Sequence, residues 1–224
     1  MPPFAVYCLT VLICYAVGSV NPSYIIGRIR GFDIRERGSK NAGASNAIIS
    51  IGVLEGVFSM IFDFMKAFGC VMVAAAVLQD WPYIAEAAGS ACILGHMFPF
   101  YMRFRGGKGL ACLGGMILAL DWKLFLIFLG AETVILFVSN YLYLVPLTAA
   151  IAFPVTWGIL QGDAIAALCL CPAAVAIVCK HIVNIKKMIQ GKELRFSYLW
   201  NKDKELAKIH AGEDDTDRGG ENPD

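Results

Sequence analysis

The 224-residue sequence has few charged side chains: only 17% are Asp, Glu, Lys or Arg, against 58% hydrophobic residues. Its mean hydropathy of +0.62 is far higher than a soluble domain of this size can hide in a core. The scarcity of charge therefore excludes a soluble globular protein and indicates an integral membrane protein. The net charge of +1 by itself says nothing about partners. For an integral membrane protein we expect membrane lipid around the chain and no nucleic-acid partner.

Several catalytic signatures are also missing. The eight cysteines include no CxxC pair typical of a metal site, so we interpret them as small apolar packing residues and predict no metal and no cofactor. A nucleotide-binding P-loop ending at Lys108 would require Gly in place of Met102 and Ser or Thr in place of Gly109. Neither an H-x4-D motif nor a Ser-His-Asp triad is discernible. These absences disfavour nucleotide hydrolysis and catalysis through a covalent intermediate on a serine.

Apolar stretches follow one another along the chain, most of them near the roughly 20 residues that a transmembrane helix needs. We predict seven, over residues 2–27, 53–79, 81–102, 110–120, two within 124–161 separated at Ser139-Asn140, and 164–179. The predicted fold is therefore all-α, a polytopic membrane protein with about seven transmembrane helices in a single domain over residues 1–200. Residues 201–224 are polar and densely charged, which predicts a disordered cytoplasmic tail.

The positive charges are distributed unevenly among the predicted loops. With seven spans, 17 of the 19 Lys and Arg residues fall on one side of the membrane, in the loop 28–40, in the loop 103–108 and from Lys180 onward. By the positive-inside rule this side is cytoplasmic. The distribution therefore places the N-terminus outside and the C-terminus inside.

A glycine-rich stretch lies between two predicted spans, in GHMFPFYMRFRGGKGLAC. Glycine lets backbone N–H groups approach a ligand closely, and a helix that begins just after it offers unpaired N–H donors. Gly106, Gly107 and Gly109 meet the first condition, and Lys108 adds a positive charge. The stretch is a candidate phosphate-binding loop. The alternative is a basic loop that only fixes membrane topology.

Two further polar segments lie on the same side of the membrane. The first, GSKNAGASN, precedes an apolar helix, where Ser39, Asn41 and Asn46 can bind an anion at the helix N-terminus or simply form an ordinary helix start. The second follows the last span. There His181 and Asn184 are three residues apart and share a helix face. They could belong to a site, contact lipid headgroups or cap the helix.

Three charged residues fall within predicted spans. Asp63 and Lys66 are three residues apart on one predicted helix, which allows them to pair. A charge deep in a bilayer costs about 2.5–3.5 kcal/mol on insertion scales, so both should face protein or water. We favour a structural ion pair beside the site over a direct role. Glu132 has no local partner, and we expect it to pack against another helix.

The three polar segments, taken together and in this order, resemble the motifs of the bacterial acyl-phosphate:glycerol-3-phosphate acyltransferase family. That family has a GSGNxGATN-type first motif, a GHxFPxFxxFKGGKG second motif and an HxxNIxRLxxGxE third motif. This sequence reads GSKNAGASN, GHMFPFYMRFRGGKG and HIVNIKKMIQGKE. Gly18-Ser19 and the block from Asp63 to Lys66 also match. The similarity covers the chain up to about Glu193.

The resemblance implies an enzyme of the bacterial cell membrane, with its active site on the cytoplasmic side. It would transfer a fatty acyl group from acyl phosphate to the sn-1 hydroxyl of glycerol 3-phosphate, giving lysophosphatidic acid and phosphate in phospholipid synthesis. By position it implies catalytic roles for Lys108, His181 and Asn184. It also implies a set of residues that contact the substrate phosphates: Ser39, Asn41, Asn46, Gly106, Gly107 and Gly109.

The sequence also departs from the family pattern. Ile49 stands where the family has a phosphate-binding arginine, and Tyr143 stands near the position of a usual serine. Arg35 or Arg37 could replace the missing cation. Two alternatives therefore stay open, a divergent paralogue with lost or altered catalysis that binds a phosphorylated lipid, and a small transporter suggested by the charges within the spans.

Overall fold

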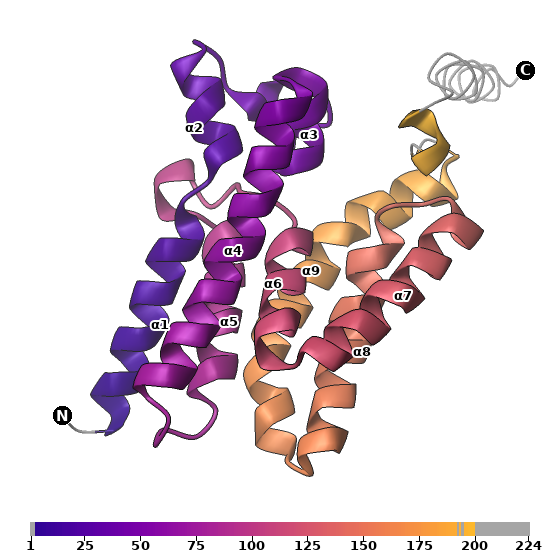
Figure 1. Ribbon diagram of the computed structural model, residues 1–224. Helices are drawn as coiled ribbons and strands as arrows, with labels where there is room; N and C mark the ends of the chain where they lie inside the picture. The colour runs from indigo at the N-terminus through magenta and orange to yellow at the C-terminus, as the bar shows by residue number, and fades with distance from the viewer. Residues whose placement is uncertain (1–2, 192, 194, 200–224) are drawn as a thin grey trace, which may run out of the picture.

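The computed structural model describes residues 3–191, 193 and 195–199; the predicted tail, 201–224, lies outside the described residues. The described part of the chain is all-α, as predicted, and contains nine α-helices (Figure 1). Their bounds are α1 (Pro3–Ser19), α2 (Pro22–Ile29), α3 (Ala44–Ser50), α4 (Val53–Val77), α5 (Ile84–Met97), α6 (Leu110–Leu120), α7 (Trp122–Ser139), α8 (Leu144–Gln161) and α9 (Ala164–Ile189).

Four of these helices, α4, α7, α8 and α9, are long and apolar enough to cross a membrane, and the bent pair of α1 and α2 makes a fifth candidate. The prediction of seven spans is not confirmed. Helix α5 has 14 residues and α6 has 11. At 1.5 Å per residue they are shorter than the roughly 30 Å hydrocarbon layer. Part of the predicted span 81–102 is loop, because the chain leaves α5 at Met97 to form the glycine-rich turn, whereas α6 has the predicted bounds 110–120.

The first predicted span, residues 2–27, contains a break: α1 ends at Ser19 and the axis bends by 43° into α2, and the two helices together are apolar enough to form one span. Pro22 cannot continue a helix because it lacks an N–H donor. Asn21 caps the new helix, its Oδ1 accepting a hydrogen bond of 2.8 Å from the Tyr24 N–H. Two backbone carbonyls at the end of α1 are thereby left without helical partners.

Helix α5 lies at the centre of the bundle and packs closely along α1. The two backbones approach each other at glycine positions. A Cβ added to Gly18 would lie 2.1 Å from the Cys92 carbonyl oxygen, and one added to Gly95 would lie 2.1 Å from that of Tyr15. Small residues allow this kind of close helix contact inside membranes. The α1–α5 contact therefore requires glycine at both positions.

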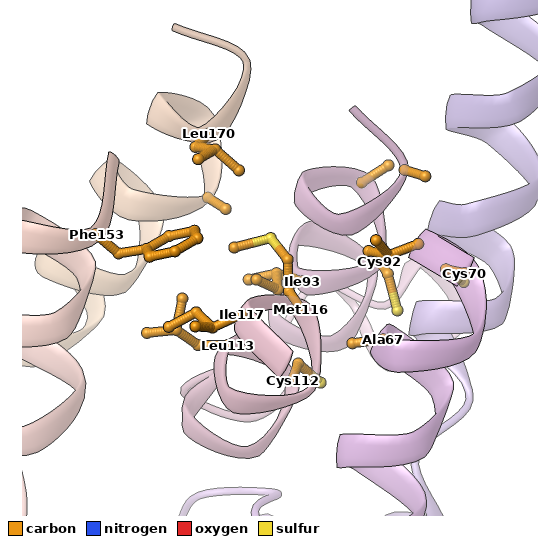
Figure 2. Close-up of a cluster of buried hydrophobic side chains, with 14 of the residues drawn as sticks. Ala67, Cys70, Cys92, Ile93, Cys112, Leu113, Met116, Ile117, Phe153 and Leu170 are labelled. Carbon is orange, nitrogen blue, oxygen red and sulfur yellow. The ribbon is translucent and has the colours of Figure 1, made fainter. Parts of the chain in front are cut away.

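The apolar core joins α4, α5 and α6 to α8 and α9 (Figure 2). Phe153 of α8 and Leu170 of α9 point toward Met116 of α6 in this view. Four cysteines are buried in or beside this cluster as free thiols, which confirms their interpretation as packing residues: Cys14, Cys70, Cys92 and Cys112. Cys179 is exposed and takes no part in the core.

The polar segments gather at one end of the bundle. In Figure 1, α1 begins at the lower end, whereas α2, α3, the loop after α5 and the end of α9 all lie at the upper end. Two short 3-10 helices shape the loops there, Ile34–Glu36 and Phe100–Met102. The fold thus brings the three motif-bearing segments to the same side of the molecule.

Replacing Gly95 by alanine should destabilise the fold, because overpacking of this kind costs about 1–3 kcal/mol. Gly69 in α4 is a matched control, since a Cβ there would meet nothing within 4 Å. We expect Gly95→Ala in detergent to melt at a lower temperature than the wild type, and Gly69→Ala at the same or a higher temperature. A Gly95→Ala protein as stable as the wild type would contradict the close approach of α1 and α5.

Candidate active site

The glycine-rich turn between α5 and α6 is folded back onto the end of α5. The Gly107 N–H donates to the His96 carbonyl oxygen at 3.1 Å, and the Gly106 N–H donates to that of Met97 at 3.0 Å. A Cβ added to Gly106 would lie 2.1 Å from the His96 carbonyl oxygen. Gly109 has φ +89° and precedes α6, so it also favours glycine. Because the first two N–H groups are already used, the donors left for a ligand lie at the start of α6.

Lys108 connects this turn to α9. Its Nζ donates to Asn184 Oδ1 at 2.6 Å, and Asn184 Nδ2 donates to Glu193 Oε1 at 2.6 Å. Partial burial lowers the pKa of Lys108, because burial disfavours its charged form, and the nearby Glu193 carboxylate opposes that shift. The second and third motifs therefore meet in a direct side-chain contact. Sequence reasoning missed Glu193, although it is the last residue of the third motif.

His181 lies one turn before Asn184 on α9, and both side chains are buried, so their predicted common face is confirmed. The His181 Nδ1 lies 2.8 Å from the Ile177 carbonyl oxygen. A carbonyl can only accept, so the proton is on Nδ1. In the neutral ring, Nε2 is then the atom free to accept a proton.

Asn46 holds the first loop together. Its Nδ2 lies 2.8–3.0 Å from the carbonyl oxygens of Ile34, Arg37 and Asn41. Its Oδ1 accepts a hydrogen bond of 2.8 Å from the Ser39 N–H. Asn46 is buried, whereas Ser39 is exposed and Asn41 half-buried. The amide of Asn46 is thus occupied by the loop itself, and Ser39 and Asn41 are the more accessible candidates for a phosphate.

The first loop is attached to the segment after α5. Arg35 Nη1 donates to the Met102 carbonyl oxygen at 2.6 Å, and its other nitrogens bind Asp33. Met102 is fully buried in a small apolar cluster with Ile34, Ala42 and Ala47. Within the described residues, the first motif reaches the second through these contacts rather than through Lys108. The three motifs form one connected assembly.

The departures from the family pattern have structural consequences. Ile49 is 52% exposed, and its uncharged side chain supplies no cation at that position. The Arg35 guanidinium is already paired with Asp33 and bonded to the Met102 carbonyl oxygen. Arg37 is exposed, and its guanidinium lies 3.9 Å from the Phe32 ring centroid. Arg37 is thus the more available replacement. Tyr143 is buried, with its hydroxyl 2.8 Å from Met188 Sδ of α9.

The charges within the spans have partners. Lys66 Nζ lies 2.6 Å from Asp63 Oδ1, which confirms the predicted pair, and Glu132 accepts hydrogen bonds from the Thr148 hydroxyl of α8. Asp63, His96 and Cys112 offer three potential metal ligands within 4.8 Å of one another. The Lys66 ammonium already lies beside two of them, so we interpret the group as an ion-pair cluster.

The model of the protein family described as glycerol-3-phosphate acyltransferase matches residues 8–191. The chain belongs to this family. Its relatives include the glycerol-3-phosphate acyltransferase of Wolbachia sp. subsp. Brugia malayi, 33% identical over 83% of this chain and 96% of the relative. Another is glycerol-3-phosphate acyltransferase 1 of Oceanobacillus iheyensis, 32% identical over 88% of this chain and 98% of the relative.

The fold resembles crystal structures of PlsY, described as an integral membrane glycerol 3-phosphate acyltransferase. The glycerol 3-phosphate form has a TM-score of 0.79 and 27% sequence identity, covering 87% of this chain and 97% of PlsY. The lysophosphatidic acid form has a TM-score of 0.76 over the same shares. The family resemblance inferred from the motifs is confirmed, and the protein is a multi-pass membrane acyltransferase.

Asn46→Asp should loosen the first loop, because a carboxylate cannot donate to the three carbonyl oxygens that surround it. An unpaired buried polar group costs about 1–3 kcal/mol. We expect trypsin to cleave the variant faster at the exposed Arg37 and Lys40 than it cleaves the wild type. Asn41→Asp makes the same chemical change at a half-buried position and should be cleaved at the wild-type rate. Equal cleavage of all three proteins would show that Asn46 does not hold the loop.

Proposed function

We propose that this protein transfers a fatty acyl group from acyl phosphate to the sn-1 hydroxyl of glycerol 3-phosphate, forming lysophosphatidic acid and inorganic phosphate. The observation that carries the proposal is the contact between Lys108, beside the N-terminus of α6, and Asn184 of α9. This contact holds a cation beside a helix N-terminus, whose first N–H groups have no partner within the helix. A cation and free N–H donors together suit a phosphate group. Family membership supports the choice of acceptor.

The chemistry needs little more than this arrangement. In a mixed anhydride the phosphate is a good leaving group, so the protein must hold two anions together and stabilise the negative charge that develops at the carbonyl oxygen. Lys108 supplies the charge, and the N–H groups at the start of α6 supply donors. Gly106 and Gly107 then act through shape, because their own N–H groups are donated within the turn.

In the reaction, the glycerol hydroxyl oxygen attacks the acyl carbon and the bond from that carbon to the phosphate oxygen breaks. The hydroxyl proton passes to a base. His181 Nε2 is one candidate, because the hydrogen bond to Ile177 keeps the proton on Nδ1. A substrate phosphate oxygen is the other. Asn184 would hold Lys108 in position while Ser39 and Asn41 contact a phosphate.

We place the protein in the bacterial cell membrane with these loops facing the cytoplasm. The basic loops lie at the end of the bundle opposite the start of α1 (Figure 1), which supports an external N-terminus under the positive-inside rule. Glycerol 3-phosphate is a charged, water-soluble compound. A site at the cytoplasmic surface would meet it directly while the acyl chain of the donor stays in the lipid.

A second candidate function is that of a divergent paralogue that binds a phosphorylated lipid without acyl transfer. The exposed Ile49 and the buried Tyr143 favour it, because both replace polar family residues. A transporter is less well supported, since Asp63, Lys66 and Glu132 are all satisfied by neighbours within the bundle.

The first test is acyl transfer itself. Purified protein in detergent should release phosphate from palmitoyl phosphate only when glycerol 3-phosphate is present, and lysophosphatidic acid should form in equal amount. Lys108→Ala should lower kcat/KM by about 10- to 100-fold, because a charge-assisted hydrogen bond contributes about 1.5–3 kcal/mol. Lys123→Ala, which removes an exposed cation at the start of α7, should have no effect.

Two outcomes would reject parts of this proposal. The absence of acceptor-dependent release by the wild type, with substrate that a known family enzyme consumes, would favour the paralogue. If Lys108→Ala turned over at the wild-type rate, the proposed reaction would stand, but the phosphate group would have to bind elsewhere in the molecule.

The reaction should also lose activity at high pH. The active form of Lys108 is the ammonium, and burial lowers its pKa from the usual 10.5, so the charge is lost as the pH rises through this lower value. We therefore expect a fall in kcat/KM that begins below pH 10.5, after subtraction of hydrolysis without acceptor. Lys108→Arg should lack this fall, because a guanidinium stays protonated up to about pH 12. The same fall in both proteins would assign it to another group.

A further inference from the structure

A buried cluster of three charged or titratable side chains lies directly beneath the glycine-rich turn. Lys66 Nζ donates to Asp63 Oδ1 at 2.6 Å, and the Nδ1 of His96 lies 3.2 Å from both of these atoms. The three residues are 2–7% exposed. Charges buried this deeply persist only when they are paired and hydrogen-bonded. The cluster joins α4 to α5 at the level where α5 ends.

The break between α1 and α2 supplies the fourth member of this cluster. Because Tyr24 N–H is bound by the Asn21 side chain, the Val20 carbonyl has no helical partner and accepts a hydrogen bond of 2.7 Å from Lys66 Nζ. The ammonium is thus held by a carboxylate, a carbonyl and an imidazole. This arrangement fixes the position of Lys66, and through it the side chains of Asp63 and His96.

The other edge of the His96 ring faces the glycine-rich turn. A Cβ added to Gly107 would lie 2.1 Å from His96 Nε2, and its three nearest neighbours would all be atoms of this ring. The backbone of His96 also accepts the Gly107 N–H at 3.1 Å. Gly107 therefore rests on the imidazole and is bonded to the same residue. The next residue along the chain is Lys108.

We infer that Asp63, Lys66 and His96 are positioning residues that set the height and direction of the turn carrying Lys108, an inference that rests on the proposed function. Asp63 and Lys66 lock the imidazole, the imidazole supports Gly107, and Gly107 fixes the backbone from which Lys108 reaches Asn184. All three side chains are buried beneath the turn, and Asp63 and His96 also lie within 4.8 Å of the buried Cys112 sulfur in the first turn of α6. They act through the turn rather than on a substrate.

His96→Asn tests this support without breaking the ion pair. The asparagine amide can replace Nδ1 beside Asp63 and Lys66, but it lacks the ring edge that Gly107 contacts. We expect kcat to fall by about 100-fold, as for a catalytic group misplaced by about 1 Å, while the melting temperature stays near that of the wild type. Ser90→Ala is the control, because it removes a partly buried hydrogen bond of 2.6 Å from the same helix to the Cys169 carbonyl oxygen. It should leave kcat unchanged.

A double-mutant cycle separates positioning from general destabilisation. Gly107→Ala should abolish most activity in the wild type, because the new Cβ collides with the His96 ring. In a His96→Ala background the three ring atoms that would collide are gone. There, Gly107→Ala should lower kcat by a much smaller factor than it does in the wild type. Equal costs in both backgrounds would overturn the inference, as would a folded His96→Asn protein with wild-type kcat.

Hydrogen exchange provides a readout that does not depend on catalysis. In His96→Asn, the amides of Gly106 and Gly107 should exchange faster than in the wild type, with the helical segments of α4 and α9 unchanged, and Ser90→Ala should not affect them. If the wild type transfers no acyl group, the proposed function fails, yet this measurement still decides whether His96 supports the turn. Unchanged exchange in His96→Asn would reject the support.

Discussion

The assembly of the end that carries the three motifs depends on the interruption of the first helix at Val20 and Asn21. Ending α1 there frees two carbonyl groups, and each is taken by another part of the molecule: Ser19 by the Tyr101 hydroxyl at 2.9 Å and Val20 by Lys66 at 2.7 Å. The Asn21 side chain meanwhile binds the Ala42 carbonyl of the first loop at 2.8 Å. An unpaired carbonyl in a bilayer costs several kcal/mol, so these partners are required rather than optional.

The charges of the protein are arranged in two ways that suit different tasks. Asp63 and Lys66 neutralise each other in the interior, where an uncompensated ion is too costly. At the end that carries the motifs the charges are not balanced, because Lys108, Lys180 and Lys187 share that region with Glu193. An excess of positive charge at the mouth of a low-dielectric bundle attracts anions.

Much of this organisation could be predicted from sequence, because it follows from hydrophobic length and local chemistry. The all-α class, the Asp63–Lys66 pair and the break near Ser139-Asn140 were predicted; Asn140 ends α7 with φ +61°. The bend at Asn21-Pro22 was missed, because the apolar run continues through it. The inward bonding of the Gly106 and Gly107 N–H groups depends on how the loop folds back on α5, which no local pattern specifies.

Helix α6 has a consequence for the lipid around the protein. Its 11 residues extend about 16 Å, roughly half the hydrocarbon thickness, and its turn into α7 lies well above the lower ends of α1, α8 and α9 in Figure 1. Asp121 and the exposed Trp122 stand at that turn, and tryptophan belongs at a headgroup boundary. Headgroups or water on the lower side in Figure 1 must therefore reach into the membrane to meet them, so we expect a thinner bilayer on that flank of the protein.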